Sequence, residues 1–268
     1  MSSTSANRPI GIFDSGIGGL SVLAALRAEL PHERFLYFSD AGHAPYGERG
    51  GDFVAARSRA IARGLVQARG IKALVVACNT ATAAAIHDLR GDWPELPLIG
   101  VEPALKPAAT LTRTGHIGVL ATRGTLASAK FRALHDSQTP LARFHLIACD
   151  GLASAIERDD AAQIDALAAR YLRALGPLGA RAGQIDTVVL GCTHYPFALA
   201  TLRRHAGPDV RLIDTGAPVA QQTRRLLAAR GALHEGPGAL TLETSGPPEA
   251  IQAAAARWLG VRSEHGLG

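Results

Sequence analysis

The 268-residue chain is poor in cysteine and in aromatic residues, and each scarcity argues against a class of protein. Its three cysteines, Cys78, Cys149 and Cys192, are odd in number, and their spacing fits neither a disulfide framework nor a zinc site. Thiols that stay reduced are typical of a cytoplasmic protein. Aromatic residues make up only 5% of the chain, which argues against a protein that stacks RNA bases.

The chain also lacks charge blocks, long apolar runs and an evident leader. The formal net charge is +5, but the arginines are scattered, so we expect a solvated surface rather than a nucleic-acid interface. No apolar run is long enough to span a bilayer, and residues 1–9 contain no apolar stretch typical of a signal peptide. The sequence therefore predicts no membrane segment.

Strand and helix patterns, in contrast, alternate along most of the chain, and 47% of its residues are hydrophobic. Such alternation predicts an α/β fold with parallel sheets covered on both faces. We expect two domains, one from residues 1–100 plus 214–268 and one from 101–213, with the Pro-containing stretch 102–107 at the boundary. The predicted strands are 10–13, 35–38, 74–77, 97–101, 116–120, 144–148, 187–190, 212–214 and 240–243, and the predicted helices include 52–69, 80–90, 161–175, 219–230 and 251–259.

Two of the cysteines end similar strands. Cys78 follows an apolar β-branched run and precedes Asn79 and Thr80, and Cys192 follows such a run and precedes Thr193 and His194. Both patterns predict a buried strand that presents a thiol to the turn before a helix, where the helix dipole favours the reactive thiolate. A single cysteine in such a place is more often an inert core residue, but the matched pair favours a reactive site.

Other polar residues also fall at predicted strand ends. Asp14 and Thr122 each close a strand, and ligands of parallel sheets bind outside such ends, so two facing domains would surround one cleft. Asp14 is either an acid/base group near Cys78 or a helix cap, and His194 is either a proton-exchange partner of Cys192 or a capping residue. The glycines of residues 16–19 lack the spacing of a nucleotide-binding loop, but backbone amides there, with Ser15, suit a small carboxylate.

A pair of thiols without a metal or cofactor motif suits proton exchange at a stereocentre. One group removes a proton from one face of the carbon, and the other delivers a proton to the opposite face. A dithiol redox site is the alternative, but such sites usually have C-x-x-C spacing, which is absent here.

Four motifs in this order resemble those of glutamate racemases, over about residues 9–260. They are Gly11–Leu20, Ala44–Gly47, Ala77–Ala81 and Gly191–Pro196, and Thr244–Gly246 and Trp258–Gly260 are similar to the family's C-terminal stretch. The resemblance implies two pseudo-symmetric three-layer α/β domains with the active site between them. It also implies a cofactor-independent, metal-free interconversion of L- and D-glutamate by two bases, which supplies D-glutamate for peptidoglycan and hence cell shape, in a cytoplasmic enzyme that is often a homodimer.

The same resemblance assigns roles to individual residues. Cys78 and Cys192 match the catalytic thiols, of which the first acts on D-glutamate and the second on L-glutamate in related enzymes. Asp14 and His194 match the auxiliary acid/base residues. The positions that match substrate contacts are Asp14, Ser15, Pro45, Tyr46, Gly47, Asn79, Thr80, Thr122, Thr193 and His194.

The chain departs from the family pattern after Cys149, where residues 150–156 lack the expected prolines. Glu157 keeps the expected spacing, and we expect it to assist Cys192. The chain also has no long N-terminal extension of the kind linked to activation by a cell-wall precursor, so we expect no obligate activator.

Other functions compete with glutamate racemisation. Aspartate and hydantoin racemases share the paired thiols, but the Asp14–Ser15 and Tyr46–Gly47 motifs favour glutamate. A non-enzymatic α/β binding module and a protein- or DNA-associated role are less expected, because neither requires thiols at two matched strand ends.

Overall fold

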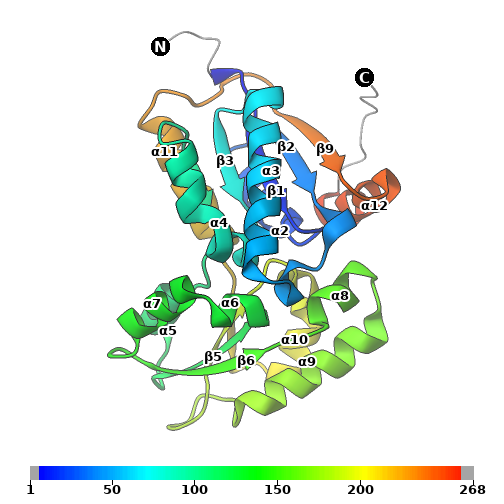
Figure 1. Cartoon of the computed structure of the whole chain (residues 1–268). Helices are drawn as coiled ribbons and strands as arrows, with labels where there is room; N and C mark the ends of the chain where they lie inside the picture. The colour runs from blue at the N-terminus through cyan, green and yellow to red at the C-terminus, as the bar shows by residue number, and fades with distance from the viewer. Residues whose placement is uncertain (1–5, 261–268) are drawn as a thin grey trace. The chain divides into compact units, whose positions relative to one another are not determined.

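The computed structural model describes residues 6–260, which form two compact units, each built around its own sheet (Figure 1). Unit 1 contains the described residues up to Val101 and those from Gly216 onward, and unit 2 runs from Glu102 to Thr215. In the described residues, no helix combines the length and apolar character that crossing a membrane requires. The start of the chain, where we expect no signal peptide, lies mostly outside these residues.

The sheet of unit 1 has the strand order β4-β3-β1-β2-β9, and its neighbouring strands are parallel. The late strand β9 joins this sheet beside β2. The strands are β1 (Ile10–Asp14), β2 (Arg34–Ser39), β3 (Ala73–Val76), β4 (Leu98–Gly100) and β9 (Ala239–Thr244). The helices are α2 (Leu20–Glu29), α3 (Gly51–Arg69), α4 (Asn79–Asp92), α11 (Gly216–Ala228) and α12 (Pro248–Leu259), with 3₁₀ turns η1 (Ala41–His43) and η2 (Tyr46–Glu48).

Helices cover both faces of this sheet, which explains why its strands are continuous apolar runs. Phe13 and Val76 pack with apolar residues of α3 and α4 on one face. Because side chains alternate along a strand, Ile12 points to the opposite face, where α2 packs against α11 and α12. Strands that are buried on both sides need apolar residues at consecutive positions.

Unit 2 has the strand order β6-β5-β7-β8, and its neighbouring strands are also parallel. In β5 and β7, Val119 and Val189 pack with α5 and α7, and Leu120 and Leu190 pack with α8, α9 and α10 on the other face. The strands are β5 (His116–Ala121), β6 (Arg143–Ala148), β7 (Thr187–Gly191) and β8 (Arg211–Ile213). The helices are α5 (Leu105–Leu111), α6 (Arg123–Ala127), α7 (Ala129–Gln138), α8 (Leu152–Glu157), α9 (Ala161–Leu175) and α10 (Leu199–Ala206), with the 3₁₀ turn η3 (Tyr195–Ala198).

The two sheets share one connectivity. The first strand of each, β1 or β5, lies centrally between the second and third strands, and the fourth strand lies outside the third. The predicted α/β class with parallel sheets is therefore confirmed. The sequence did not predict α5, α6, α8 or α10. Pro107 lies in the first turn of α5, and the other three helices have only 5, 6 and 8 residues.

Candidate active site

Cys78 lies at the carboxyl end of β3 and caps the N-terminus of α4. Its Sγ accepts a hydrogen bond from the Ala81 backbone N–H at 3.4 Å and lies 3.9 Å from Ser15 Oγ. Only 5% of Cys78 is exposed. The thiol thus donates to the Ser15 hydroxyl oxygen and accepts from a backbone N–H at the positive end of a helix dipole, a place where protein thiols become reactive.

Asp14 ends the neighbouring strand β1 and is fully buried. Its Oδ2 accepts hydrogen bonds from the backbone N–H groups of Gly19 at 2.9 Å and Gly16 at 3.4 Å. A side chain at Gly19 would collide, because its Cβ would lie 2.7 Å from Asp14 Cβ and 2.8 Å from the Tyr37 hydroxyl. Asp14 therefore fixes the turn that leads into α2, and an acid/base role for it stays a prediction.

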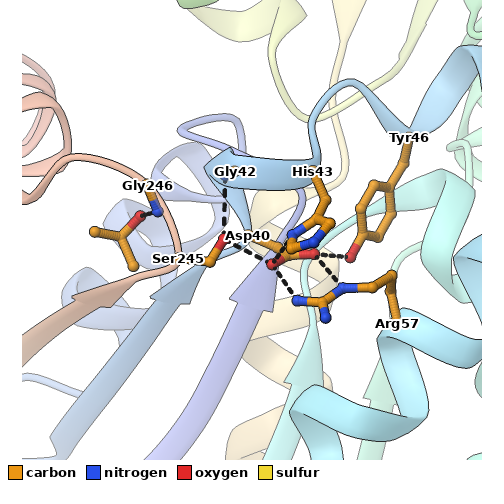
Figure 2. Close-up of polar contacts among 8 residues, drawn as sticks. Asp40, Gly42, His43, Tyr46, Arg57, Ser245 and Gly246 are labelled. Atoms are coloured by element: carbon orange, nitrogen blue, oxygen red, sulfur yellow. Dashed lines mark hydrogen bonds and ion pairs between the residues drawn. The ribbon is translucent and has the colours of Figure 1, made fainter.

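The other predicted substrate contacts in unit 1 surround these two strand ends. Asn79 and Thr80 begin α4, and both are buried. In the described part of the chain, neither polar atom of the Asn79 amide has a hydrogen-bond partner. Because buried polar groups are normally paired, this amide is a ready donor and acceptor for a bound molecule. Pro45–Gly47 leads into and begins η2, where the Tyr46 hydroxyl donates to Asp40 Oδ2 at 2.5 Å (Figure 2).

Cys192 follows β7 in unit 2, and a chain of polar contacts runs from it to a carboxylate. Its Sγ lies 3.6 Å from His194 Nδ1, and His194 Nε2 lies 2.6 Å from Glu157 Oε1, at the end of α8. Burial disfavours the charged imidazole, but its hydrogen bonds to Cys192 and Glu157 outweigh burial and raise the pKa of His194 well above its ordinary value. The hydrogen bonds to both ring nitrogens therefore favour the charged form of His194, which lies between a thiol and a carboxylate.

Thr122 and Thr193 lie at the same end of the second sheet. The register of β5 and β7 pairs Ala121 with Gly191, so Thr122 follows one strand next to the position where Cys192 follows the other. Thr122 Oγ1 caps α6 by accepting from the Thr125 N–H at 3.2 Å. Thr193 is buried directly after the thiol.

Cys149 occupies a different environment from the other two thiols. It is buried in the core between β6 and the helices α8 and α9, and its thiol donates to the Ile147 carbonyl at 3.6 Å. Burial raises the pKa of Cys149 well above its ordinary value. A protonated core thiol of this kind is unreactive.

The structure thus groups the predicted residues by unit. Cys78, Asp14 and Ser15 come together in unit 1, and Cys192, His194 and Glu157 come together in unit 2. Within residues 6–260, no group of three His, Cys, Asp or Glu side chains is placed to hold a metal ion. The sequence did not single out Asp40, although it follows a strand end as Asp14 and Cys78 do, and that position was the available signal.

Comparison with known proteins places this arrangement in a family. Residues 20–223 match the Asp/Glu/Hydantoin racemase family. A glutamate racemase from Pseudomonas putida is 51% identical over 231 residues, which cover 85% of each chain. The crystal structure of a glutamate racemase isoform from Bacillus anthracis superposes with a TM-score of 0.84 at 34% identity, covering 96% of each chain.

A second solved structure extends the comparison to a complex. The glutamate racemase from Francisella tularensis in complex with D-glutamate gives a TM-score of 0.82 at 26% identity, covering 97% of this chain and 96% of that one. Because both the sequence and the fold match over most of the chain, the chain belongs to the Asp/Glu/Hydantoin racemase family, and these relatives are its glutamate racemases.

Proposed function

We propose that this chain is a cofactor-independent glutamate racemase that uses Cys78 and Cys192 as its two bases. One observation carries the proposal. Two thiols end topologically equivalent strands, β3 and β7, in a chain that is 51% identical to a glutamate racemase. The D-glutamate in the Francisella tularensis complex identifies the substrate class for that relative.

The proposed reaction moves one proton on and one proton off the α-carbon. The Cys78 thiolate removes the α-proton of D-glutamate, and the electron pair of the broken C–H bond stays on the substrate as a carbanion. The Cys192 thiol then donates its proton to the opposite face and gives L-glutamate. In the reverse direction the two thiols exchange roles, so each must act as both acid and base.

His194 and Glu157 serve Cys192 in this scheme. An imidazolium whose N–H faces the sulfur stabilises the Cys192 thiolate and returns a proton when the thiol is needed. Glu157 holds the imidazole from its other nitrogen at 2.6 Å, which fixes the ring and favours its charge. Asp14 is the proposed auxiliary acid/base group on the Cys78 side.

We further propose that glutamate contacts the residues at these strand ends in each unit. The unpartnered Asn79 amide, together with Ser15, Thr80 and the N-terminus of α4, offers donors for a carboxylate of glutamate. The remaining proposed contacts are the turn Pro45–Gly47, Thr122, Thr193 and His194. The proposed setting is a cytoplasmic homodimer that supplies D-glutamate for peptidoglycan synthesis.

Circular dichroism of the purified protein with pure L- or D-glutamate, without added cofactor, tests this proposal. We expect the ellipticity of either enantiomer to decay to zero, and that of L-aspartate to remain. Decay with aspartate and not with glutamate would make the substrate assignment wrong. Stable signals with both amino acids would contradict the enzymatic proposal itself.

A further inference from the structure

Asp40 is a fully buried carboxylate at the same sheet edge as Asp14 and Cys78, and the proposed reaction assigns it no role. It follows β2, and the strand order β3-β1-β2 places these three strand ends in one row. The Asp40 N–H also donates to the Asp14 carbonyl at 2.9 Å, which extends the pairing of β1 and β2 by one bond. The backbone thus fixes Asp40 directly beside Asp14.

Side chains from three separate parts of unit 1 converge on this carboxylate (Figure 2). Arg57 of α3 makes a two-point contact, with Nε 3.0 Å from Oδ2 and Nη2 2.7 Å from Oδ1. The Tyr46 hydroxyl donates to Oδ2 at 2.5 Å, and the Ser245 hydroxyl donates to Oδ1 at 2.8 Å. His43 Nδ1 lies 3.0 Å from the same Oδ1. A carboxylate has about four acceptor positions, so these contacts occupy its capacity.

The charge on Asp40 is stabilised within the protein. Burial alone would favour the neutral acid, but the hydrogen bonds from Arg57, Tyr46 and Ser245 outweigh burial and lower the pKa of Asp40. A buried anion whose oxygens already accept from protein donors has no acceptor position left for a substrate proton. Its position therefore suits the support of other residues and not proton transfer.

The segment that Asp40 supports is the one that carries the proposed substrate turn. Residues 41–48 contain only the short 3₁₀ turns η1 and η2, so few backbone bonds hold this segment. Tyr46 is buried, and its hydroxyl proton is engaged by Asp40, so the contribution of this turn to binding comes from its backbone and its shape. Fixing such a turn in advance removes part of the entropy cost of binding.

The C-terminal part of the chain completes the support. Ser245 directly follows β9, its N–H donates to the Ser39 carbonyl at 3.0 Å, and its Oγ accepts from the Gly42 N–H at 3.1 Å. The two segments approach so closely that a Cβ on Gly42 would lie 2.8 Å from the Ser245 carbonyl oxygen. These contacts give the Thr244–Gly246 motif a structural role, because Ser245 holds the segment that follows β2.

We propose, resting on the proposed glutamate racemisation, that Asp40 is a positioning residue: with Arg57 and Ser245 it fixes the turn Pro45–Gly47 in its binding conformation and sets the affinity for glutamate. The rate of proton transfer is left to the thiols and their partners. A purely structural role would instead change the melting temperature and leave KM unaltered in the protein that folds.

The test compares KM, kcat and melting temperature in five variants. Asp40→Asn is expected to raise KM about tenfold or more with kcat changed by no more than about threefold, since a loosened turn weakens positioning. Ser245→Ala and Gly42→Ala are expected to raise KM by a smaller factor, and Ser245→Thr, which keeps the hydroxyl, to restore it. Gly50→Ala is the matched control for Gly42→Ala, because nothing lies within 4 Å of its Cβ. It should match the wild type.

Calorimetric titration with glutamate in a Cys78→Ala background separates binding from turnover. We expect the Asp40→Asn change to weaken glutamate binding there by the same factor as it raises KM. An unchanged KM and dissociation constant in folded Asp40→Asn, or a loss confined to kcat, would overturn the proposal. If Asp40→Asn does not fold, equal KM values for Ser245→Ala and Ser245→Thr would overturn it. A wild-type protein that does not racemise glutamate would instead contradict the proposed function, and the binding titration would still test the role of Asp40.

Discussion

The two strand ends that carry Cys78 and Cys192 are equivalent in topology and different in chemistry. Each thiol follows the strand next to the central strand of its sheet. Cys78 contacts a backbone N–H and lies near the Ser15 hydroxyl, and Cys192 contacts the imidazole of His194. The shared fold therefore supplies the position of a thiol, and the residues that follow each strand supply its proton chemistry.

The carboxylates in the two units differ in the same way. In unit 1, Asp14 lies on the central strand and bonds to the backbone of the next turn. In unit 2 the equivalent strand end carries Thr122, and the carboxylate of Glu157 comes from α8 and reaches the thiol through His194. The two thiols that we propose as acid and base thus have different neighbours, and the variants below test that difference.

Removing either thiol of the pair should have the largest effect. Cys78→Ala and Cys192→Ala are each expected to lower kcat by on the order of 10³-fold or more, because one face of the α-carbon then lacks its acid and base. The measurement is the decay of ellipticity with L- and D-glutamate. Near-normal turnover in either variant would show that the strand ends do not form a catalytic pair.

Removing the imidazole of His194, which contacts the thiol of unit 2, should have the next largest effect on turnover. His194→Gln is expected to lower kcat/KM by about 10²-fold, because it removes the proton partner of Cys192. Glu157→Gln is expected to lower it by about tenfold, because Glu157 only orients the imidazole. Racemisation has an equilibrium constant of unity, so kcat/KM must fall equally in both directions. An effect of Glu157→Gln larger than that of His194→Gln would contradict this order.

The two units should also respond oppositely to pH. The raised pKa of His194 gives stability that is complete below about pH 6.5, its ordinary value, and is lost as the pH rises through the folded value. The lowered pKa of Asp40 gives stability that is present above about pH 3.9 and is lost as the pH falls through the folded value.

Melting temperatures measured across pH check these two signs. The melting temperature of the wild type should exceed that of His194→Gln by more in mildly acidic than in alkaline solution. The difference between the wild type and Asp40→Asn should instead shrink toward strong acid. The opposite trend in either variant would mean that the charge on that residue is not stabilised by folding.

Cys149 should give the smallest catalytic effect. Cys149→Ala is expected to keep activity within about twofold, because its thiol is a core group, and to cost about 1 kcal/mol of unfolding free energy from lost packing. Kinetics and thermal unfolding of this variant provide the control for the other two alanine substitutions. A loss of turnover as large as that in Cys192→Ala would show that Cys149 takes part in the reaction.

Much of this architecture could be predicted because patterns of neighbouring residues determine it. The buried parallel strands are continuous apolar runs, and the strand-end position of both cysteines follows from those runs. The contact between Cys192 and His194 spans two positions in the chain, so the motif itself contains it. Glu157 was expected only from its spacing in the family, and its contact with His194 joins residues 37 positions apart.

The contacts around Asp40 could not be predicted, because they join residues that are far apart in the chain. Asp40 contacts Arg57 over 17 positions and Ser245 over 205, and no local pattern connects such residues. Asp40 also resembles an ordinary strand-end aspartate until the fold shows that its oxygens are occupied. Long-range polar networks depend on the folded arrangement of several elements, which periodicity and composition do not encode.

Deuterium exchange at the α-carbon tests the two-base account most directly. In D₂O, Cys78→Ala retains Cys192 and should label L-glutamate without racemising it, and Cys192→Ala retains Cys78 and should label D-glutamate only. Mass spectrometry of each enantiomer after incubation gives the result. Labelling of the same enantiomer by both variants, or racemisation by either at the wild-type rate, would contradict the assignment of one thiol to each face.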